Sequence, residues 1–250
     1  PDDLNPAEAY KRASVVLRDS EARRYVGALA YHLYDTKVSE LARDLAHMRN
    51  LAAEHGIPIW MTEFSVPNDI TFSGAMEWMK IIHTLVATYN VSAVDYMWGF
   101  FGAWEKNHTI LSIEFLDGQY VQHHVGPLYY LTGQFSKFVR PGLVRVETHS
   151  SSQDLLVTAY KSGSQSVIVA INAGHEDRRV NVTVTDAVAP LHFSAIRTTV
   201  REFWSELEPI ASDTSTFNVA LPAQSVTTYR GGSIDSADPL FGAGIKKCAQ

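Results

Sequence analysis

The chain begins with helical patterns that alternate with short apolar runs. Residues 6–18 predict a helix, because Asn5 is a favourable N-cap and a proline at the first helical position is well tolerated. Residues 38–55 predict a second helix, in which leucine and methionine recur on one face. The same periodicity predicts helices over residues 73–89 and 125–135. The first part of the chain is therefore expected to be rich in amphipathic helices.

Between these helices lie three apolar runs of strand length, over residues 25–32, 57–64 and 91–101. Strands that alternate with helices and are apolar nearly throughout favour a parallel sheet covered by helices. Either an eight-fold β/α (TIM) barrel or an open doubly wound sheet has this pattern. The sequence does not favour a nucleotide-binding open sheet, because none of these runs is followed by the phosphate-binding motifs GxGxxG or GxxxxGK[ST]. A barrel would be represented by less than half of its eight units.

The pattern changes near residue 138, after which short alternating runs follow one another with turn residues between them. These runs cover residues 143–148, 155–160, 166–171, 179–185, 196–203, 214–220 and 226–229. Short strands at such regular spacing predict a β-sandwich. The expected fold class is α/β plus all-β: a partial barrel over residues 1–137, a β-sandwich over 138–231, and a tail or linker over 232–250.

Composition narrows the class of protein. Hydrophobic residues make up 46% of the chain and charged residues 19%, which excludes an intrinsically disordered protein. The net charge of −6 supplies no basic face, so no nucleic-acid partner is expected. No apolar run reaches the roughly 18 residues needed for a transmembrane segment, and no signal peptide is visible. The chain is expected to be a mildly acidic globular protein.

Polar side chains at the ends of the first two apolar runs are the first candidates for chemistry. Glu63 ends the second run, where barrel enzymes place their reacting groups; the alternative is a solvated surface carboxylate. His32 and Tyr34 end the first run and alternate with the pleat, so they can face the same side. They could bind sugar hydroxyls near a carboxylate, or they could be ordinary packed residues.

Glycine-interleaved aromatic residues follow the third run and include Trp98 and Trp104. Such rings can form a platform for the apolar face of a sugar, although ordinary core aromatics are an equally good interpretation. The sequence contains no HExxH and no GxSxG, and the single Cys248 has no evident activating base. Neither a metal site nor a cofactor is expected.

These residues together resemble glycoside hydrolase family 30. The resemblance rests on Glu63, the strand with His32 and Tyr34, Trp98, and above all residues 133–146, Gly-Gln-Phe-Ser-Lys-Phe-Val-Arg-Pro-Gly-Leu-Val-Arg-Val. Two later strands, over 167–172 and 221–228, also look like strands of that family's sandwich, so the resemblance covers nearly the whole chain.

The family resemblance implies a β/α barrel joined to a β-sandwich and a retaining cleavage of β-O-glycosidic bonds. Glu63 would be the nucleophile on the seventh barrel strand, and His32 and Tyr34 would contact substrate from the sixth. Trp98 would lie at the end of the eighth strand. Trp104, from the aromatic segment described above, is a further candidate substrate contact. The binding partner would be a carbohydrate or glycoside substrate. The enzyme would be either a glucosylceramidase-like β-glucosidase or a related β-glycanase. Such an enzyme is expected outside the cell or in the periplasm.

The chain departs from the family pattern at one important point. The family's general acid/base is a Glu that follows Asn on the fourth strand, and no Asn-Glu dipeptide occurs here. The first five barrel strands have no counterpart either. The chain is therefore expected to be incomplete as an enzyme, to need a complementary N-terminal barrel segment, and to aggregate when alone because of open sheet edges. The alternative class is a non-catalytic carbohydrate-binding or interaction module.

Overall fold

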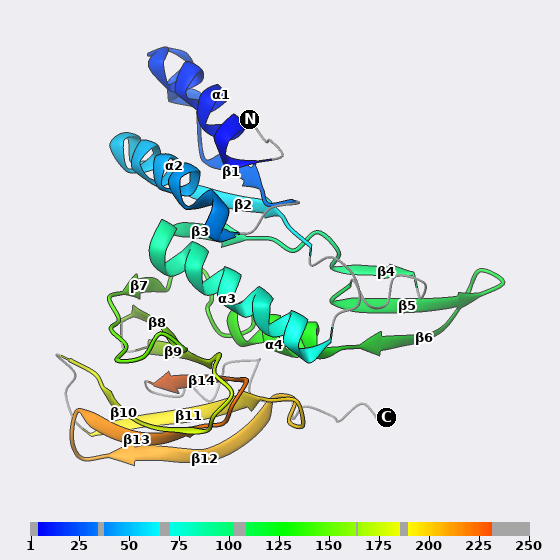
Figure 1. Ribbon diagram of the computed structural model, residues 1–250, viewed down its shortest axis with the longest axis vertical. Helices are drawn as coiled ribbons and strands as arrows, with labels where there is room; N and C mark the ends of the chain where they lie inside the picture. The colour runs from blue at the N-terminus through cyan, green and yellow to red at the C-terminus, as the bar shows by residue number, and fades with distance from the viewer. Residues whose placement is uncertain are drawn as a thin grey trace.

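The structure is a computed structural model that describes residues 5–34, 38–65, 71–102, 109–163, 165–185 and 190–231. Trp104 and the expected tail over 232–250 lie outside these residues. Helices and a small parallel sheet form one half of the molecule and a β-sandwich forms the other (Figure 1). No helix in the described ranges is long and apolar enough to cross a bilayer.

The first half alternates helices and strands as the sequence predicts. Its parallel sheet has the order β1-β2-β3. The elements are α1 (Pro6–Arg18), β1 (Leu29–His32), α2 (Ala42–His55), β2 (Ile59–Glu63), α3 (Phe72–Tyr89) and β3 (Val91–Val94), with short 3-10 turns at Ala22–Tyr25 and Val38–Leu41. The predicted helices are confirmed, whereas each strand is shorter than the apolar run that predicted it.

Local chemistry sets the helix ends. The Asn5 side chain accepts a hydrogen bond from the Glu8 N–H at the start of α1, as its N-cap position requires. Gly56 (φ 64°) and Asn90 (φ 56°) adopt the left-handed conformation that ends α2 and α3. The chain can therefore turn sharply into the strand that follows each helix.

The parallel sheet is buried mainly on the face that meets the helices. Tyr31 and Met61 on that face are fully buried, whereas Trp60 on the opposite face is 44% exposed and Ser92 is also exposed. The helices therefore cover one face of this parallel sheet, and Trp60 on the other face stays exposed.

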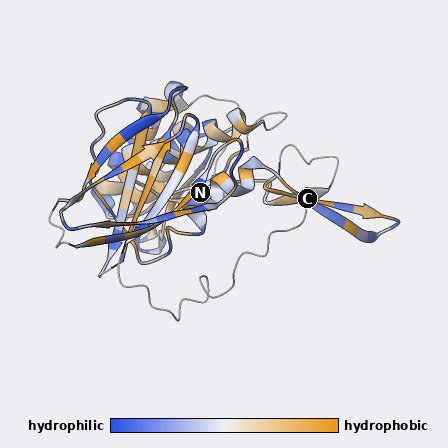
Figure 2. Cartoon of the chain, turned by 90° about the horizontal axis from the view of Figure 1, so that it is seen from below, coloured by the Kyte–Doolittle hydropathy of each residue, from blue (hydrophilic) through white to orange (hydrophobic). Residues whose placement is uncertain are grey.

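A projecting hairpin follows the parallel sheet. β4 (Phe100–Gly102) pairs in parallel with β5 (Leu111–Leu116), which pairs antiparallel with β6 (Gln119–Val125). Asp117 (φ 51°) and Gly118 (φ 75°) form the two-residue turn, a combination that matches the right-handed twist of hairpin strands. Hydrophilic and hydrophobic residues share this arm, which stands away from the body (Figure 2). Helix α4 (Pro127–Ser136) returns the chain to the body.

The second half is the predicted β-sandwich. A six-stranded antiparallel sheet of order β12-β11-β14-β9-β8-β7 faces a two-stranded sheet, β10-β13. The strands are β7 (Val144–Val146), β8 (Leu155–Ser162), β9 (Gln165–Asn172), β10 (Arg178–Thr183), β11 (Leu191–Thr198), β12 (Ser205–Ser212), β13 (Thr216–Leu221) and β14 (Ser225–Gly231). The prediction of a strand over 196–203 is wrong in its bounds: β11 ends at Thr198, and β12 follows where none was expected.

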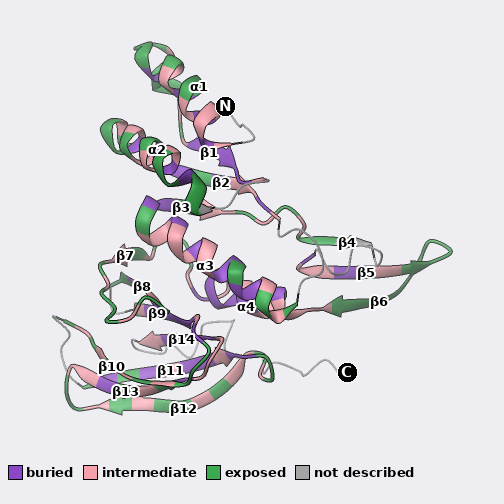
Figure 3. Ribbon diagram, viewed as in Figure 1, coloured by how far each residue is buried: buried purple, intermediate pink, exposed green. Residues whose placement is uncertain are grey.

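The two halves share a buried junction, with purple segments on facing elements (Figure 3). Gln134 on α4 is fully buried; its amide donates to Thr198 Oγ1 (2.8 Å), and its Oε1 accepts from Thr228 Oγ1 (2.7 Å). The Trp204 indole donates to the Tyr130 carbonyl (2.7 Å) and lies over Gly133, where an added Cβ would overlap the ring. The segment that carried the family resemblance is thus the packing surface between α4 and the sandwich.

Candidate active site

Parallel pairing of β1 and β2 brings the first two groups of candidate residues together. His32 is the register partner of Glu63, and the Leu33 N–H donates to the Glu63 carbonyl (2.9 Å). A register shift between Tyr31 and His32 allows this match at the carboxyl ends of the two strands. Residues 31 positions apart in sequence therefore meet at one end of the sheet.

The Glu63 carboxylate lies against two side chains from the neighbouring strand and the residues that follow it. The Tyr34 hydroxyl donates to Glu63 Oε2 (2.8 Å), and His32 Nδ1 lies 3.4 Å from the same oxygen. The rings of His32 and Tyr34 meet edge to face at 84°, with their centroids 5.7 Å apart. The Glu63 side chain remains 33% exposed, against 11% for His32. One oxygen is thus fixed while the carboxylate stays open to a ligand, which is what a positioned nucleophile needs.

A rigid aromatic cluster lies behind this carboxylate. The ring of Phe64, the next residue, stacks on Trp78 with centroids 5.0 Å apart and planes at 6°. Tyr96 meets Trp78 edge to face (5.3 Å), and the Trp78 indole donates to Thr132 Oγ1 (3.0 Å). Because successive strand residues point to opposite faces, anchoring Phe64 against the helices directs Glu63 away from them.

The chain beyond β3 passes beside the end of β2. The Met97 N–H donates to the Phe64 carbonyl (2.8 Å). Phe64 follows Glu63 and Trp98 follows Met97, so this hydrogen bond brings Trp98 close to Glu63 along the backbone. The Trp98 carbonyl accepts from the Ile110 N–H (3.0 Å), and the residue is half-buried. The structure thus places Trp98 near the same strand ends, while its contact with a sugar stays a prediction.

Asp95 is an acidic residue that the sequence argument missed. Its N–H donates to the Met61 carbonyl (2.8 Å), which sets it at the end of β3 beside the end of β2. Burial raises the pKa of its carboxyl above the usual range for aspartate, although the residue reaches solvent. Asp95 lies inside the apolar run over residues 91–101, and a charged residue within such a run was the signal that could have found it.

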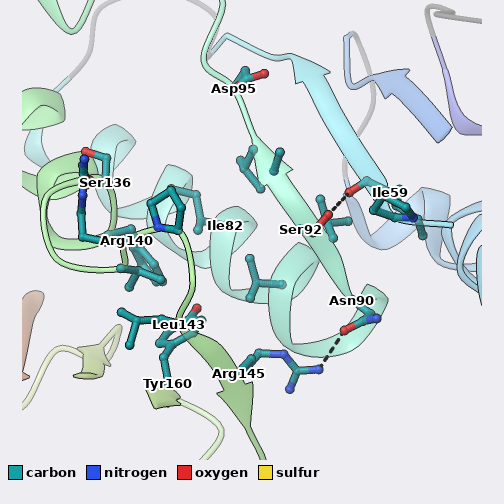
Figure 4. A pocket seen from close by; sticks show the side chains of 18 of the residues that line it. Ile59, Ile82, Asn90, Ser92, Asp95, Ser136, Arg140, Leu143, Arg145 and Tyr160 are labelled. Carbon is teal, nitrogen blue, oxygen red and sulfur yellow. Dashed lines mark hydrogen bonds between the residues drawn. The ribbon is translucent and has the colours of Figure 1, made fainter. Parts of the chain in front are cut away.

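A cavity of about 1250 Å³ lies along the outer edge of β3, between that strand, α3, α4 and the segment leading to β7 (Figure 4). Arg145 donates to Asn90 Oδ1 (3.2 Å) at one end, and Asp95 lies at the other. Glu63 is not among the lining residues. Within the described ranges, no group of three or more His, Cys, Asp or Glu residues is arranged to hold a metal ion. The contacts of Glu63, and not the cavity, define the candidate site.

Comparisons with known proteins find the same combination of a β/α sheet and a sandwich among glycoside hydrolases. Residues 142–229 match the glycosyl hydrolase family 30 beta sandwich domain. The glucuronoxylanase XynC of Bacillus subtilis strain 168 is 30% identical over 227 residues, covering 86% of this chain and 48% of that protein.

Solved structures extend the match across both halves. A family 30 endoxylanase from Clostridium papyrosolvens C71 superposes with a TM-score of 0.75 at 27% identity, covering 93% of this chain and 55% of that one. A family 30 subfamily 8 xylanase from Clostridium acetobutylicum gives 0.71 at 26% identity, covering 93% and 55%. The chain therefore carries the family 30 beta sandwich domain over residues 142–229, and over both halves it resembles family 30 xylanases, with the C-terminal portion of a β/α barrel followed by the sandwich. It spans about half the length of the curated relatives it matches.

Proposed function

We propose that this chain forms the nucleophile-bearing part of a retaining glycoside hydrolase that cleaves β-linked glycans. The observation that carries the proposal is the Glu63 carboxylate, which accepts a hydrogen bond from Tyr34 through one oxygen, lies beside His32 and stays open to solvent. Relatives named as xylanases favour a β-glycanase acting on a xylan-like polymer over a glucosylceramidase-like enzyme. Such a polymer is too large to enter a cell, which favours action outside the cell or in the periplasm.

In the proposed reaction a Glu63 oxygen attacks the anomeric carbon of the bound sugar. The glycosidic C–O bond breaks, the leaving oxygen takes a proton from a general acid, and a glycosyl ester of Glu63 forms. Water then cleaves the ester and restores the carboxylate. The Tyr34 hydroxyl keeps the carboxylate in one orientation throughout, so that attack needs little rearrangement.

The proton donor is proposed to come from a complementary N-terminal barrel segment. Retaining enzymes hold their two carboxyl groups about 5–5.5 Å apart. The side chains in contact with the Glu63 carboxylate in the described ranges are a phenol and an imidazole, from Tyr34 and His32. We also propose the division between catalytic part and sandwich near residue 138, with the sandwich supporting α3 and α4 from behind.

Covalent labelling tests the assignment of Glu63. A 2-fluoro-xylobioside with an activated leaving group needs no proton donor to form the glycosyl ester, so the test does not depend on the general acid. Mass spectrometry of a peptic digest should find the label on Glu63, and the Glu63→Gln variant should stay unlabelled. Asp95→Asn is the matched control, since it removes a neighbouring strand-end carboxylate and should leave labelling intact. A label on a different carboxylate would contradict the role of Glu63.

The alternative class, a non-catalytic carbohydrate-binding module, gives a different result in the same experiment. Such a module binds the unreactive sugar reversibly and forms no ester with Glu63. Reversible binding without any covalent product would therefore favour the module over the enzyme.

A further inference from the structure

The two faces of the β5–β6 hairpin differ in character. On one face, Gln122 Nε2 donates to Glu114 Oε2 (2.6 Å), and His124 Nε2 lies 3.3 Å from the same oxygen. Residues directly opposite each other in an antiparallel pair point to the same face. Glu114 is opposite Gln122, and two residues away Ser112 is opposite His124, so both pairs share this face. On this face the Glu114 carboxylate is therefore already engaged by its polar neighbours.

The other face carries three aromatic rings, which we call the ring platform: Phe115, Tyr120 and His123. Phe115 and Tyr120 are directly opposite each other in the hairpin. The Tyr120 hydroxyl and His123 Nδ1 share a hydrogen bond (2.8 Å), and the two rings lie 26° from parallel with centroids 6.4 Å apart. Phe115 and Tyr120 are each 58% exposed. The hydrogen bond thus holds the Tyr120 and His123 rings side by side, and the exposed Phe115 lies directly opposite Tyr120. An exposed group of large rings on one face of a hairpin points to a binding surface.

The base of the hairpin is bonded to the candidate active site. The Ile110 and Leu111 N–H groups donate to the carbonyls of Trp98 and Gly99 (3.0 Å each), and β5 continues outward from there. At about 3.4 Å per residue, the strand from Leu111 to Leu116 extends roughly 17 Å. One hydrogen-bonded scaffold therefore runs from the end of β2, beside Glu63, through the Trp98 segment to the ring platform.

We propose that the ring platform is a distal subsite for a neutral β-linked glycan chain whose reacting sugar lies at Glu63; this rests on the function proposed above. Pyranose rings present flat apolar faces that stack on aromatic rings, and their hydroxyls can bond to the Tyr120 hydroxyl at the rim. Phe115 and Tyr120 carry no charge, which matches an uncharged sugar. Because the platform lies away from the reacting group, it contributes to the binding of long chains and not of short ones.

Binding of xylobiose and xylohexaose by the full chain, measured calorimetrically, tests this proposal. The unmodified chain should bind xylohexaose at least about tenfold more tightly than xylobiose, which corresponds to one or two stacked rings. The double variant Phe115→Ala/Tyr120→Ala should lose most of this preference and bind xylobiose as before. Both side chains are exposed, so the variant should fold, which circular dichroism checks.

Two further variants test whether the rings of the platform, and not the hairpin tip in general, cause the length preference. Leu116→Ala removes a 67% exposed apolar side chain from the same hairpin tip, but that residue follows Phe115 and points to the opposite face, so the length preference should persist. Tyr120→Phe keeps the ring and should keep most of the preference. Loss of preference in Leu116→Ala to the same extent as in the double variant would overturn the platform.

Other outcomes separate this proposal from the function it rests on. Equal affinity of the unmodified chain for the two oligosaccharides overturns the ring platform even if the fluoro-sugar labels Glu63. Labelling of another carboxylate overturns the nucleophile even if the length preference is found. Sedimentation could also find that the unmodified chain is a dimer and that the double variant is a monomer. That result would show that a second copy of the chain covers these rings, and it would overturn the proposal.

Discussion

At the scale of single residues, the site depends on how one carboxylate oxygen is held. Glu63 Oε2 accepts from the Tyr34 hydroxyl and lies near His32 Nδ1, while Phe64 is fixed in the aromatic cluster behind it. A hydrogen bond to a charged group is among the stronger polar interactions in a folded protein. Tyr34 is therefore expected to act by positioning the carboxylate and not by entering the reaction.

Removing this hydroxyl gives a direct test. Tyr34→Phe keeps the ring but leaves the Glu63 carboxylate without its donor, so the rate of fluoro-sugar labelling should fall about tenfold to a hundredfold. Labelling kinetics followed by intact mass measure the change. Tyr25→Phe changes an exposed residue that precedes the start of β1, at the opposite end of the strand from His32, and should label at the original rate. An unchanged rate in Tyr34→Phe would show that the hydroxyl does not position the carboxylate.

At the scale of elements, the contact between α4 and the sandwich is specified by close packing. Gly133 lets the Trp204 indole lie directly on the helix, and the same indole donates to the Tyr130 carbonyl. Trp204 itself has a positive φ of 51°, an uncommon conformation for a bulky residue. Packing of the indole is what compensates this backbone strain.

A pair of glycine substitutions separates packing from helix propensity. Gly133→Ala should destabilise the protein by about 1–3 kcal/mol, because the new methyl group overlaps the Trp204 ring. Gly74→Ala in α3 has its nearest neighbour at 3.7 Å and should be neutral or stabilising by roughly 0.5–1 kcal/mol. Urea unfolding midpoints measure both, and equal midpoints for the two variants would contradict the packing argument.

At the scale of the whole molecule, the core is continuous from the parallel sheet into the sandwich. Helices α3 and α4 pack on one face of the six-stranded sheet, and β10 and β13 cover the other. His83 on α3 lies in this junction, with its Nε2 3.3 Å from the Val157 carbonyl. Burial, together with the positive charge of Arg145, lowers the pKa of His83 below its usual value.

The lowered pKa predicts a pH dependence of the junction. The unfolded chain takes up a proton on His83 near the ordinary pKa of 6.5, while the folded chain does so only at lower pH. The free energy of unfolding should therefore fall as the pH drops below about 6.5 and level off below the folded pKa. His83→Gln should flatten this part of the profile in urea titrations at several pH values, whereas the surface variant His149→Gln should not.

The sequence by itself determined the helices, the change from mixed to all-β structure near residue 138, and Glu63, His32 and Tyr34 as candidates. These features depend on local signals: apolar periodicity, caps such as Asn5 and Gly56, and polar residues that end apolar runs. Local patterns were enough because each helix or strand has to bury one face, whatever its neighbour is.

Only the tertiary structure decided which of these residues meet. The register shift in β1 that sets His32 opposite Glu63, and the pairing that brings Asp95 to the end of β2, are long-range choices. The hairpin with Phe115 and Tyr120, and strand β12, also escaped the sequence argument, because short exposed strands lack a buried face to give them a clear period. Pairing partners are set by the packing of the whole chain, which no local pattern contains.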